Sequence, residues 1–322
     1  MNLHLSEKNY LMETTSKKYF HLNFDGNGNG YFGIWVVNII LTIITLGLYY
    51  PWAKIANRKY IWNSTSMQGD RFIFNGTGIE IFKGFVIAYA VLAVTVVLIF
   101  LSPFFAFLFY LILFLIMPFA IFGAWRYRVS RTSWRGIYFS FDGNMREFFK
   151  LYFLHFLLTI LTFGIYAAWF RVKVMNYLFS HTRFGQYRMD FTGNGGDLFV
   201  IDLLGTILTF LTLGIYIAWY IKNRFHFTIE NIVLRNEEKK YYLKCNHAGG
   251  DVFVVNLVNG ILSAITLGLF TPWAIMRYQK LFLESVYIPE DIELDALEQS
   301  ADDFNDATGD SMLDILDVGL DF

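Results

Sequence analysis

The octet TLGLYYPW at residues 45–52 carries the main evidence on the fold, because close versions of it occur four times in the chain. The other three are TFGIYAAW (162–169), TLGIYIAW (212–219) and TLGLFTPW (266–273). Each copy ends an apolar stretch and is followed by Lys or Arg. Each contains a glycine that permits a kink, a tight helix contact or a C-terminal turn, namely Gly47, Gly164, Gly214 and Gly268.

The end of each octet is typical of a membrane–water interface. Its aromatic rings favour the headgroup level, and the basic side chains that follow can reach lipid phosphates. We therefore expect four interface anchors, Trp52, Trp169, Trp219 and Trp273. No catalytic role is needed to explain the octet.

The composition favours a chain whose surface faces lipid. Of 322 residues, 55% are hydrophobic and 16% are charged, whereas soluble domains average about 25% charged residues. The single Cys excludes an intrachain disulfide, and six scattered His with one Cys form no zinc spacing, so we expect no metal and no cofactor.

Six apolar stretches reach the length of about 20 residues that a bilayer requires. They predict spans at about 31–50, 83–101, 103–124, 151–170, 198–220 and 252–274. Short aromatic segments with alternating polarity precede the apolar stretches and read as strands with turns. They are YFHLNFDGNG (19–28), RFIFNGTG (71–78), IYFSFDGN (137–144), YRMDFTGNGG (187–196) and YYLKCNHAGG (241–250).

These observations predict an all-α polytopic membrane protein. About six transmembrane helices would form a bundle built from internal repeats, with short β-strands in the connecting segments. Residues 1–30 would be an N-terminal segment with a short strand, and residues 31–289 the transmembrane domain. Residues 290–322 contain 12 of the 27 acidic residues and no Lys or Arg, and they would form an acidic, disordered tail.

Residues 24–78 resemble a known family. The pattern FDGNG (24–28), the stretch from Asn38 to Tyr60 around the first octet, and NSTSMQGDRFIFNGTG (63–78) are similar to the bacterial inner-membrane YjgN family. The resemblance covers most of residues 20–289, and that family is a domain of unknown function. It implies a multi-pass protein of the bacterial inner membrane and supplies no activity and no site residues.

Polar residues recur within the apolar stretches and form the candidate site. Aligned on the octet, they fall in two columns one helical turn apart: Asn38, His155 and Asn259 in one, and Asp202 and Asn256 in the other. Ionisable groups inside a bilayer are costly and usually face protein or water. They therefore predict a polar path in which Asp202 and His155 bind a proton or cation, or alternatively hydrogen bonds that hold helices together.

The orientation is open, because two patterns conflict. Six spans would place two octets at one face of the membrane and two at the other, yet all four end in basic residues. The conflict disappears if the octets are re-entrant elements and every basic cluster faces the cytoplasm.

The function predicted is that of a transporter or channel for a small solute or ion. The alternative is a non-transporting scaffold or adaptor that binds a protein partner or lipid. An enzyme is not expected, because no catalytic motif appears. The partners predicted are the bilayer, anionic lipid at basic loops such as RYRVSRTSWRG (126–136), and an unknown protein at the acidic tail, but no nucleic acid.

Overall fold

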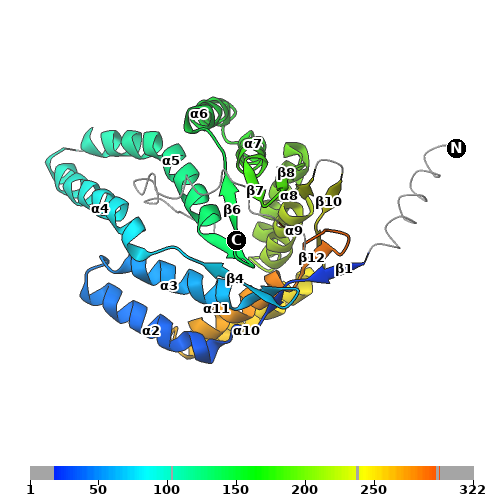
Figure 1. Ribbon diagram of the computed structural model, residues 1–322. Helices are drawn as coiled ribbons and strands as arrows, with labels where there is room; N and C mark the ends of the chain where they lie inside the picture. The colour runs from blue at the N-terminus through cyan, green and yellow to red at the C-terminus, as the bar shows by residue number, and fades with distance from the viewer. Residues whose placement is uncertain (1–17, 103, 237–238, 295–296, 298–322) are drawn as a thin grey trace.

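The computed structural model describes residues 18–102, 104–236, 239–294 and 297. Within them the chain forms five helical hairpins separated by short strands (Figure 1). The hairpins are α2 (Gly28–Ile44) with α3 (Tyr50–Asn63), α4 (Gly78–Leu101) with α5 (Phe104–Ser130), α6 (Met145–Leu161) with α7 (Ala167–Ser180), α8 (Gly195–Leu211) with α9 (Ile217–Glu230), and α10 (Gly249–Ile265) with α11 (Thr271–Leu283).

The strands form two antiparallel sheets in the described part of the chain. Nine pair in the order β10-β9-β8-β7-β6-β5-β4-β3-β2, and three in the order β1-β12-β11. Their bounds are β1 (Tyr19–His21), β2 (Asn23–Phe24), β3 (Thr65–Met67), β4 (Asp70–Phe74), β5 (Thr132–Trp134), β6 (Ile137–Phe141), β7 (Thr182–Phe184), β8 (Tyr187–Phe191), β9 (Ile232–Arg235), β10 (Lys240–Tyr242), β11 (Lys244–Cys245) and β12 (Val286–Pro289).

The two sheets join into one closed ring of strands, which we call the strand barrel. Only Leu22 separates β1 from β2, and only Leu243 separates β10 from β11. Strand β12 pairs with β1 on one side and with β11 on the other, so it connects both edges of the larger sheet. In the described part of the chain, both edges of the nine-stranded sheet thus continue into the ring and are not left free to pair with another chain.

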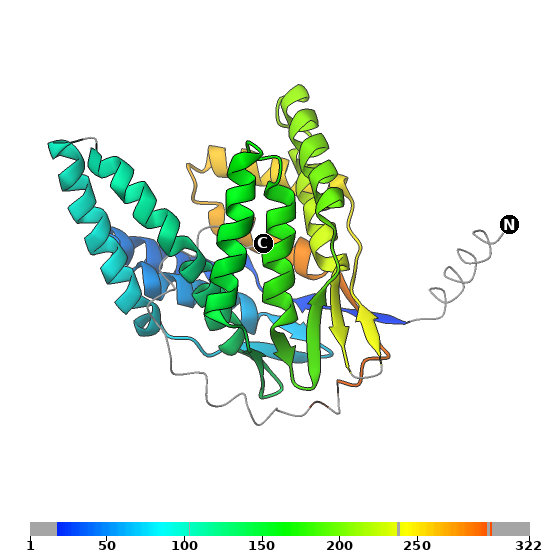
Figure 2. The same cartoon turned by 90° about the horizontal axis from the view of Figure 1, so that it is seen from above.

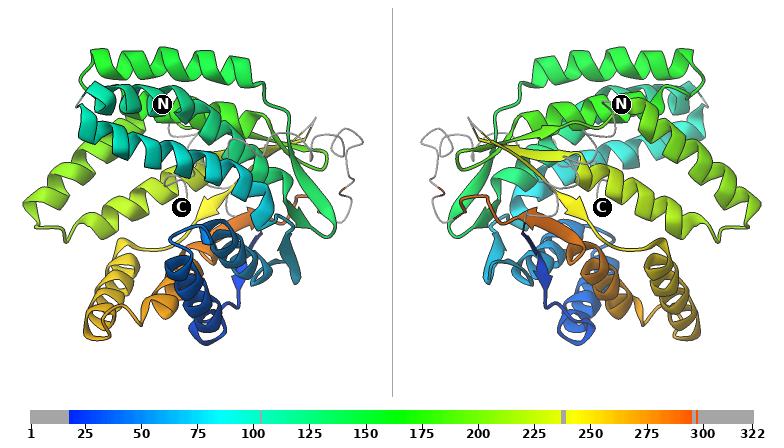
Figure 3. Two further views of the ribbon diagram at one scale, coloured as in Figure 1. Left: turned by 90° about the vertical axis from the view of Figure 1, so that its left-hand side faces the viewer. Right: turned by 90° about the vertical axis from the view of Figure 1, so that its right-hand side faces the viewer.

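The helices also close into a ring. The second helix of each hairpin packs against the first helix of the next, and α11 packs against α2 (Figure 3). Seen from above, the hairpins α4/α5, α6/α7 and α8/α9 extend away from the strands (Figure 2). Every hairpin therefore begins and ends at the strand barrel, with its tip at the far end.

The octet forms the corner of a helical hairpin. In the first copy Leu46 (φ 51°) and Gly47 (φ 92°) adopt left-handed conformations, and the Gly47 amide donates to the Thr42 carbonyl at 2.7 Å. This is a Schellman ending of the first helix. The Thr45 hydroxyl donates to the Leu41 carbonyl and accepts from the Tyr49 amide, where the second helix starts. The other three copies repeat these φ values and hydrogen bonds.

The tryptophan of each octet joins its hairpin to the next. Trp52 lies against Gly78, Trp169 against Gly195, Trp219 against Gly249, and Trp273 against Gly28. A Cβ atom at any of these glycines would come within 2.2–2.5 Å of an indole carbon. Glycine is therefore required where the first helix begins, because only a backbone without a side chain fits against the indole.

The prediction of an all-α bundle with six spans was wrong. The stretches 31–50, 151–170, 198–220 and 252–274 each cross a corner, so each contains a first helix, a turn and the start of a second helix. Hydropathy could not reveal the turn, because its residues are apolar as well: Phe163 is 98% exposed and Leu213 is 95% exposed. Among the described residues, α4 and α5 are the helices long and apolar enough to cross a membrane.

Candidate functional site: the filled strand barrel

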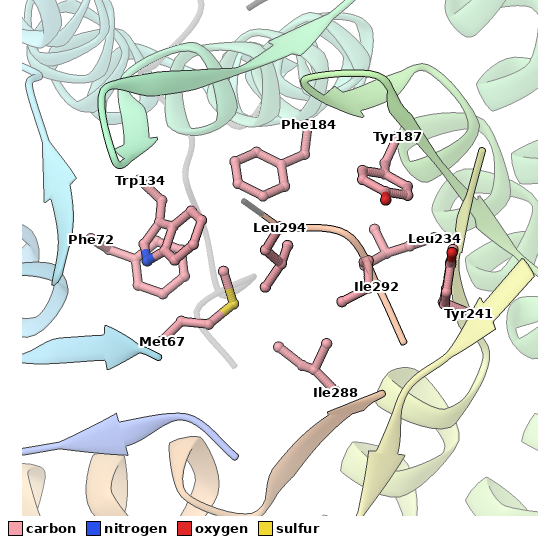
Figure 4. Close-up of a cluster of buried hydrophobic side chains, with 10 residues drawn as sticks. All are labelled: Met67, Phe72, Trp134, Phe184, Tyr187, Leu234, Tyr241, Ile288, Ile292 and Leu294. Atoms are coloured by element: carbon pink, nitrogen blue, oxygen red, sulfur yellow. The ribbon is translucent and has the colours of Figure 1, made fainter. Parts of the chain in front are cut away.

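The interior of the strand barrel is filled by large apolar side chains. Trp134, Phe184 and Tyr187 are almost completely buried there, and Met67, Phe72, Leu234, Tyr241 and Ile288 complete the lining. These side chains converge from strands on every side of the barrel (Figure 4). Such an interior has the character of a protein core rather than of a polar channel.

The chain's own C-terminal segment lies inside this lining. After β12 it turns at Glu290 and places Ile292 and Leu294 among the barrel residues, each only 4% exposed (Figure 4). Leu297 packs on the same cluster. We call residues 290–294 with Leu297 the plug segment. The tail predicted to begin at residue 290 therefore starts with a packed element, and residues 298–322 lie outside the described part of the chain.

The plug segment is held mainly by side chains. Its described backbone hydrogen bonds are local, apart from the Glu290 amide, which donates to the Lys18 carbonyl at 2.9 Å, and the Glu293 amide, which donates to the Tyr187 hydroxyl at 3.2 Å. The segment is not a member of either described sheet. Burial of Ile292 and Leu294, rather than a strand ladder, therefore provides most of its attachment.

Acidic side chains alternate with the two buried ones. Glu290, Asp291 and Glu293 are exposed, while Ile292 and Leu294 are buried. Burial raises the pKa of Tyr241, and the negative charges of Asp291 and Glu293 raise it further. The plug segment thus presents an apolar face to the barrel and an acidic face to solvent.

The predicted polar positions lie within individual hairpins. The Asn38 amide donates to Asn57 Oδ1 at 3.0 Å, and the Asn259 amide donates to the Ala274 carbonyl at 3.2 Å. Nδ1 of His155 lies 2.9 Å from the Tyr166 hydroxyl. In each case the partner belongs to the corner or second helix of the same hairpin.

Asp202 also has partners within its own hairpin. Its carboxylate accepts a hydrogen bond from the Tyr220 hydroxyl at 3.0 Å and forms an ion pair with Arg224 at 3.3 Å. Asn256 is half-buried on α10. The described hydrogen bonds do not join these predicted residues to one another. The sequence analysis missed Tyr220 and Arg224, which the corner after α8 brings opposite Asp202.

Comparisons with known proteins identify the family. The model of the family described as "Bacterial protein of unknown function (DUF898)" matches residues 20–190 and 220–315. "Inner membrane protein YjgN" of Escherichia coli K12 is 33% identical over 150 residues, which are 46% of this chain and 37% of that protein. The protein of the same name in Salmonella typhimurium is 34% identical over 127 residues, 39% of this chain and 32% of that protein.

The matches span about a third of the length of these curated relatives. No solved structure matches the chain. The resemblance to the YjgN family is confirmed, and the relatives support a location in the bacterial inner membrane. The chain belongs to the DUF898 family, and it is a bacterial inner-membrane protein.

Proposed function

We propose that this member of the DUF898 family is a membrane adaptor whose strand barrel binds an extended apolar polypeptide segment. The plug segment supports the proposal, because it shows what the barrel accepts: two apolar side chains two residues apart, with acidic residues between and around them. In this proposal the plug segment is a self-ligand, and a partner segment of the same pattern exchanges with it.

The hairpins would hold the barrel at the membrane. Their tips and the outer faces of the first helices carry exposed apolar side chains, including Leu46, Phe163, Leu213 and Leu267. A first helix of 17 residues is about 25 Å long, nearly the thickness of the apolar core of a bilayer. The hairpin α4/α5 and its four shorter neighbours would all enter the membrane from the same face. In this proposal they arose by internal duplication, and the protein is multi-pass.

An orientation belongs to the same proposal. Both ends of each hairpin lie at the strand barrel, and the strands themselves carry basic residues, among them Arg71, Arg183, Arg188 and Arg235. Positive charge is enriched on the cytoplasmic side of inner-membrane proteins. The barrel and the plug segment would therefore face the cytoplasm, where a soluble or membrane-bound partner can reach them.

A peptide exchange experiment tests the adaptor function. The full chain carrying Ile292→Asp and Leu294→Asp, purified in detergent, is mixed with a fluorescent peptide of residues 288–300. We expect the peptide to bind this variant saturably. Its affinity for the unchanged chain should be at least tenfold lower, because the chain's own plug segment competes with the peptide. A peptide with the same two substitutions is the control and should not bind. Equal peptide binding by both chains, or by both peptides, would contradict the proposal.

Transport of a small ion is the second candidate, and the observation that favours it is the charged group around Asp202. Arg224 and Tyr220 of α9 contact its carboxylate, which lies on the strongly apolar helix α8, and both members of the ion pair remain about 30% exposed. If the protein transports an ion, Asp202→Asn should abolish pH-dependent ion flux into liposomes that contain the protein, while leaving the protein folded. Unchanged flux would remove Asp202 from any transport path.

A further inference from the structure

Three potential metal ligands meet where the last two hairpins leave the strand barrel. His226 lies near the end of α9, Cys245 is the last residue of β11, and His247 lies two residues further on, just before α10. Their ligand atoms all lie within 4.8 Å of one another. The residues come from separate parts of the sequence, and the packing of α9 on α10 and on β11 brings them together.

The two imidazoles carry nitrogen atoms without a hydrogen-bond partner. Nε2 of His226 and Nε2 of His247 are both buried and unpaired among the described residues. His247 is only 8% exposed, and its ring centroid lies 4.7 Å from that of His226. Leaving a buried polar atom unpaired costs about 1–3 kcal/mol, and a metal ion bound to Nε2 of His226 would remove that cost at this residue.

The surroundings orient His226 as a ligand. Its Nδ1 lies 3.4 Å from the Glu230 carboxylate one turn further along α9. The hydrogen bond from His226 lowers the pKa of Glu230, which keeps the carboxylate ionised. A carboxylate that accepts from Nδ1–H leaves the lone pair on Nε2, and metal-binding histidines commonly have such a partner.

Cys245 and His247 already lie near ligand spacing. The Cys245 sulfur is 3.6 Å from His247 Nδ1 and 3.3 Å from the Ser285 hydroxyl. Bond lengths of about 2.3 Å to sulfur and 2.0–2.1 Å to nitrogen place two tetrahedral ligands about 3.5 Å apart. Nδ1 is thus the His247 nitrogen placed to bind beside the sulfur, and side-chain rotations would bring the His226 ligand atom, which lies within 4.8 Å of the other two, onto the same ion.

We propose that His226, Cys245 and His247 bind one thiophilic d¹⁰ metal ion, Zn²⁺ or Cu(I). One thiolate and two imidazoles are a donor set that suits both ions. The Cys245 thiol loses its proton to solvent as the metal–sulfur bond forms, and the Ser285 hydroxyl can then donate to the thiolate. Three protein ligands leave a fourth position on zinc for water, or complete a three-coordinate copper site.

The charges nearby are compatible with a cation. The imidazole of His247 packs against the rings of Phe225, Phe282 and His226, a buried setting that disfavours its protonated form. Neutral imidazole is the form that binds metal. Lys222 is the unfavourable charge, and the carboxylates of Glu230 and Asp251 oppose it.

The site would also stabilise closure of the strand barrel. Ser285, which contacts the cysteine sulfur, directly precedes β12, and β12 both closes the ring and leads into the plug segment. A metal held by α9, β11 and the turn before α10 would therefore fix the position of this last strand.

Metal titration of the full chain in detergent tests the proposal. Zn²⁺ and Cu(I) are added separately to metal-free protein in competition with a chromophoric chelator, and Co²⁺ is added as a spectroscopic probe. We expect one Zn²⁺ or Cu(I) ion per chain and a thiolate-to-cobalt charge-transfer band. Cys245→Ser and His247→Asn should weaken binding at least tenfold, and the cobalt band should be lost in Cys245→Ser. Glu230→Gln should weaken binding about 10–100-fold through His226.

His21→Asn is the matched control, because His21 is exposed on β1 and lies outside the cluster. Circular dichroism and gel filtration of the metal-free variants show whether each remains folded. The proposal is overturned if the unchanged chain binds neither ion more tightly than Cys245→Ser does, or if His21→Asn weakens binding equally.

Discussion

Shortening the buried side chains of the plug segment should release it from the strand barrel. Leu294 and Ile292 are each only 4% exposed, and replacing such a residue with Ala costs about 2–5 kcal/mol in a packed core. At the lower limit of about 2 kcal/mol, Leu294→Ala alone should raise the population of the undocked segment about 30-fold. The double variant with Ile292→Ala should raise it further, because both side chains pack in the same cluster.

Limited proteolysis measures this population. A Glu-specific protease can cleave after Glu290 or Glu293, which are exposed, once the segment leaves the barrel, and mass spectrometry identifies the products. When docking is fast, the cleavage rate follows the undocked fraction. Ile73→Ala is the control, since Ile73 is 47% exposed on β4 and should not change the rate. An unchanged cleavage rate in Leu294→Ala would show that the barrel does not hold the segment.

Three further predictions concern the hairpins. Gly78→Ala should lower the apparent Tm, because the added Cβ would lie 2.5 Å from the Trp52 ring and overpacking costs about 1–3 kcal/mol, whereas Gly33→Ala, in open space, should not. Thr212→Val should destabilise the protein by about 1–3 kcal/mol by leaving the Tyr216 amide unpaired, measured by thermal unfolding; no loss would contradict the corner geometry. In a variant that keeps only Trp219, the tryptophan fluorescence should be quenched most strongly by lipids brominated near the headgroups. Strongest quenching by lipids brominated at the ends of the acyl chains would contradict an interface position.

Local structure could be predicted from the sequence to a large extent. The aromatic segments predicted as strands form β1 with β2, β4, β6, β8, and β10 with β11. The period of two and the Gly/Asn turns specify such strands locally. The pairing of these strands could not be predicted. Strand β12 pairs with β1 at the opposite end of the described chain, and a local sequence pattern does not indicate pairing between strands so far apart in the sequence.

The plug segment and the metal ligands illustrate the same limit. Ile292 and Leu294 stand out in the tail only as two apolar residues among acids, and that pattern also occurs in disordered chains. His226 is separated from Cys245 by a strand hairpin, so the spacing resembles no known zinc motif. Both features depend on where the strand ring closes, which is a property of the whole fold.

Because each octet forms a hairpin corner, its four copies need not lie at opposite faces of a membrane. In a chain of alternating spans, a phrase followed by Lys and Arg would lie at opposite faces in successive copies, against the preference of positive charge for one face. A corner returns the chain to its starting side, so every copy can carry the same apolar tip and the same basic second helix. The hairpin without the octet, α4/α5, has helices of 24 and 27 residues instead of 17 and 13–14, and turns at Ser102. Its greater length makes it the hairpin suited to cross a bilayer completely, while the octet marks the shorter hairpins that the strand barrel holds around it.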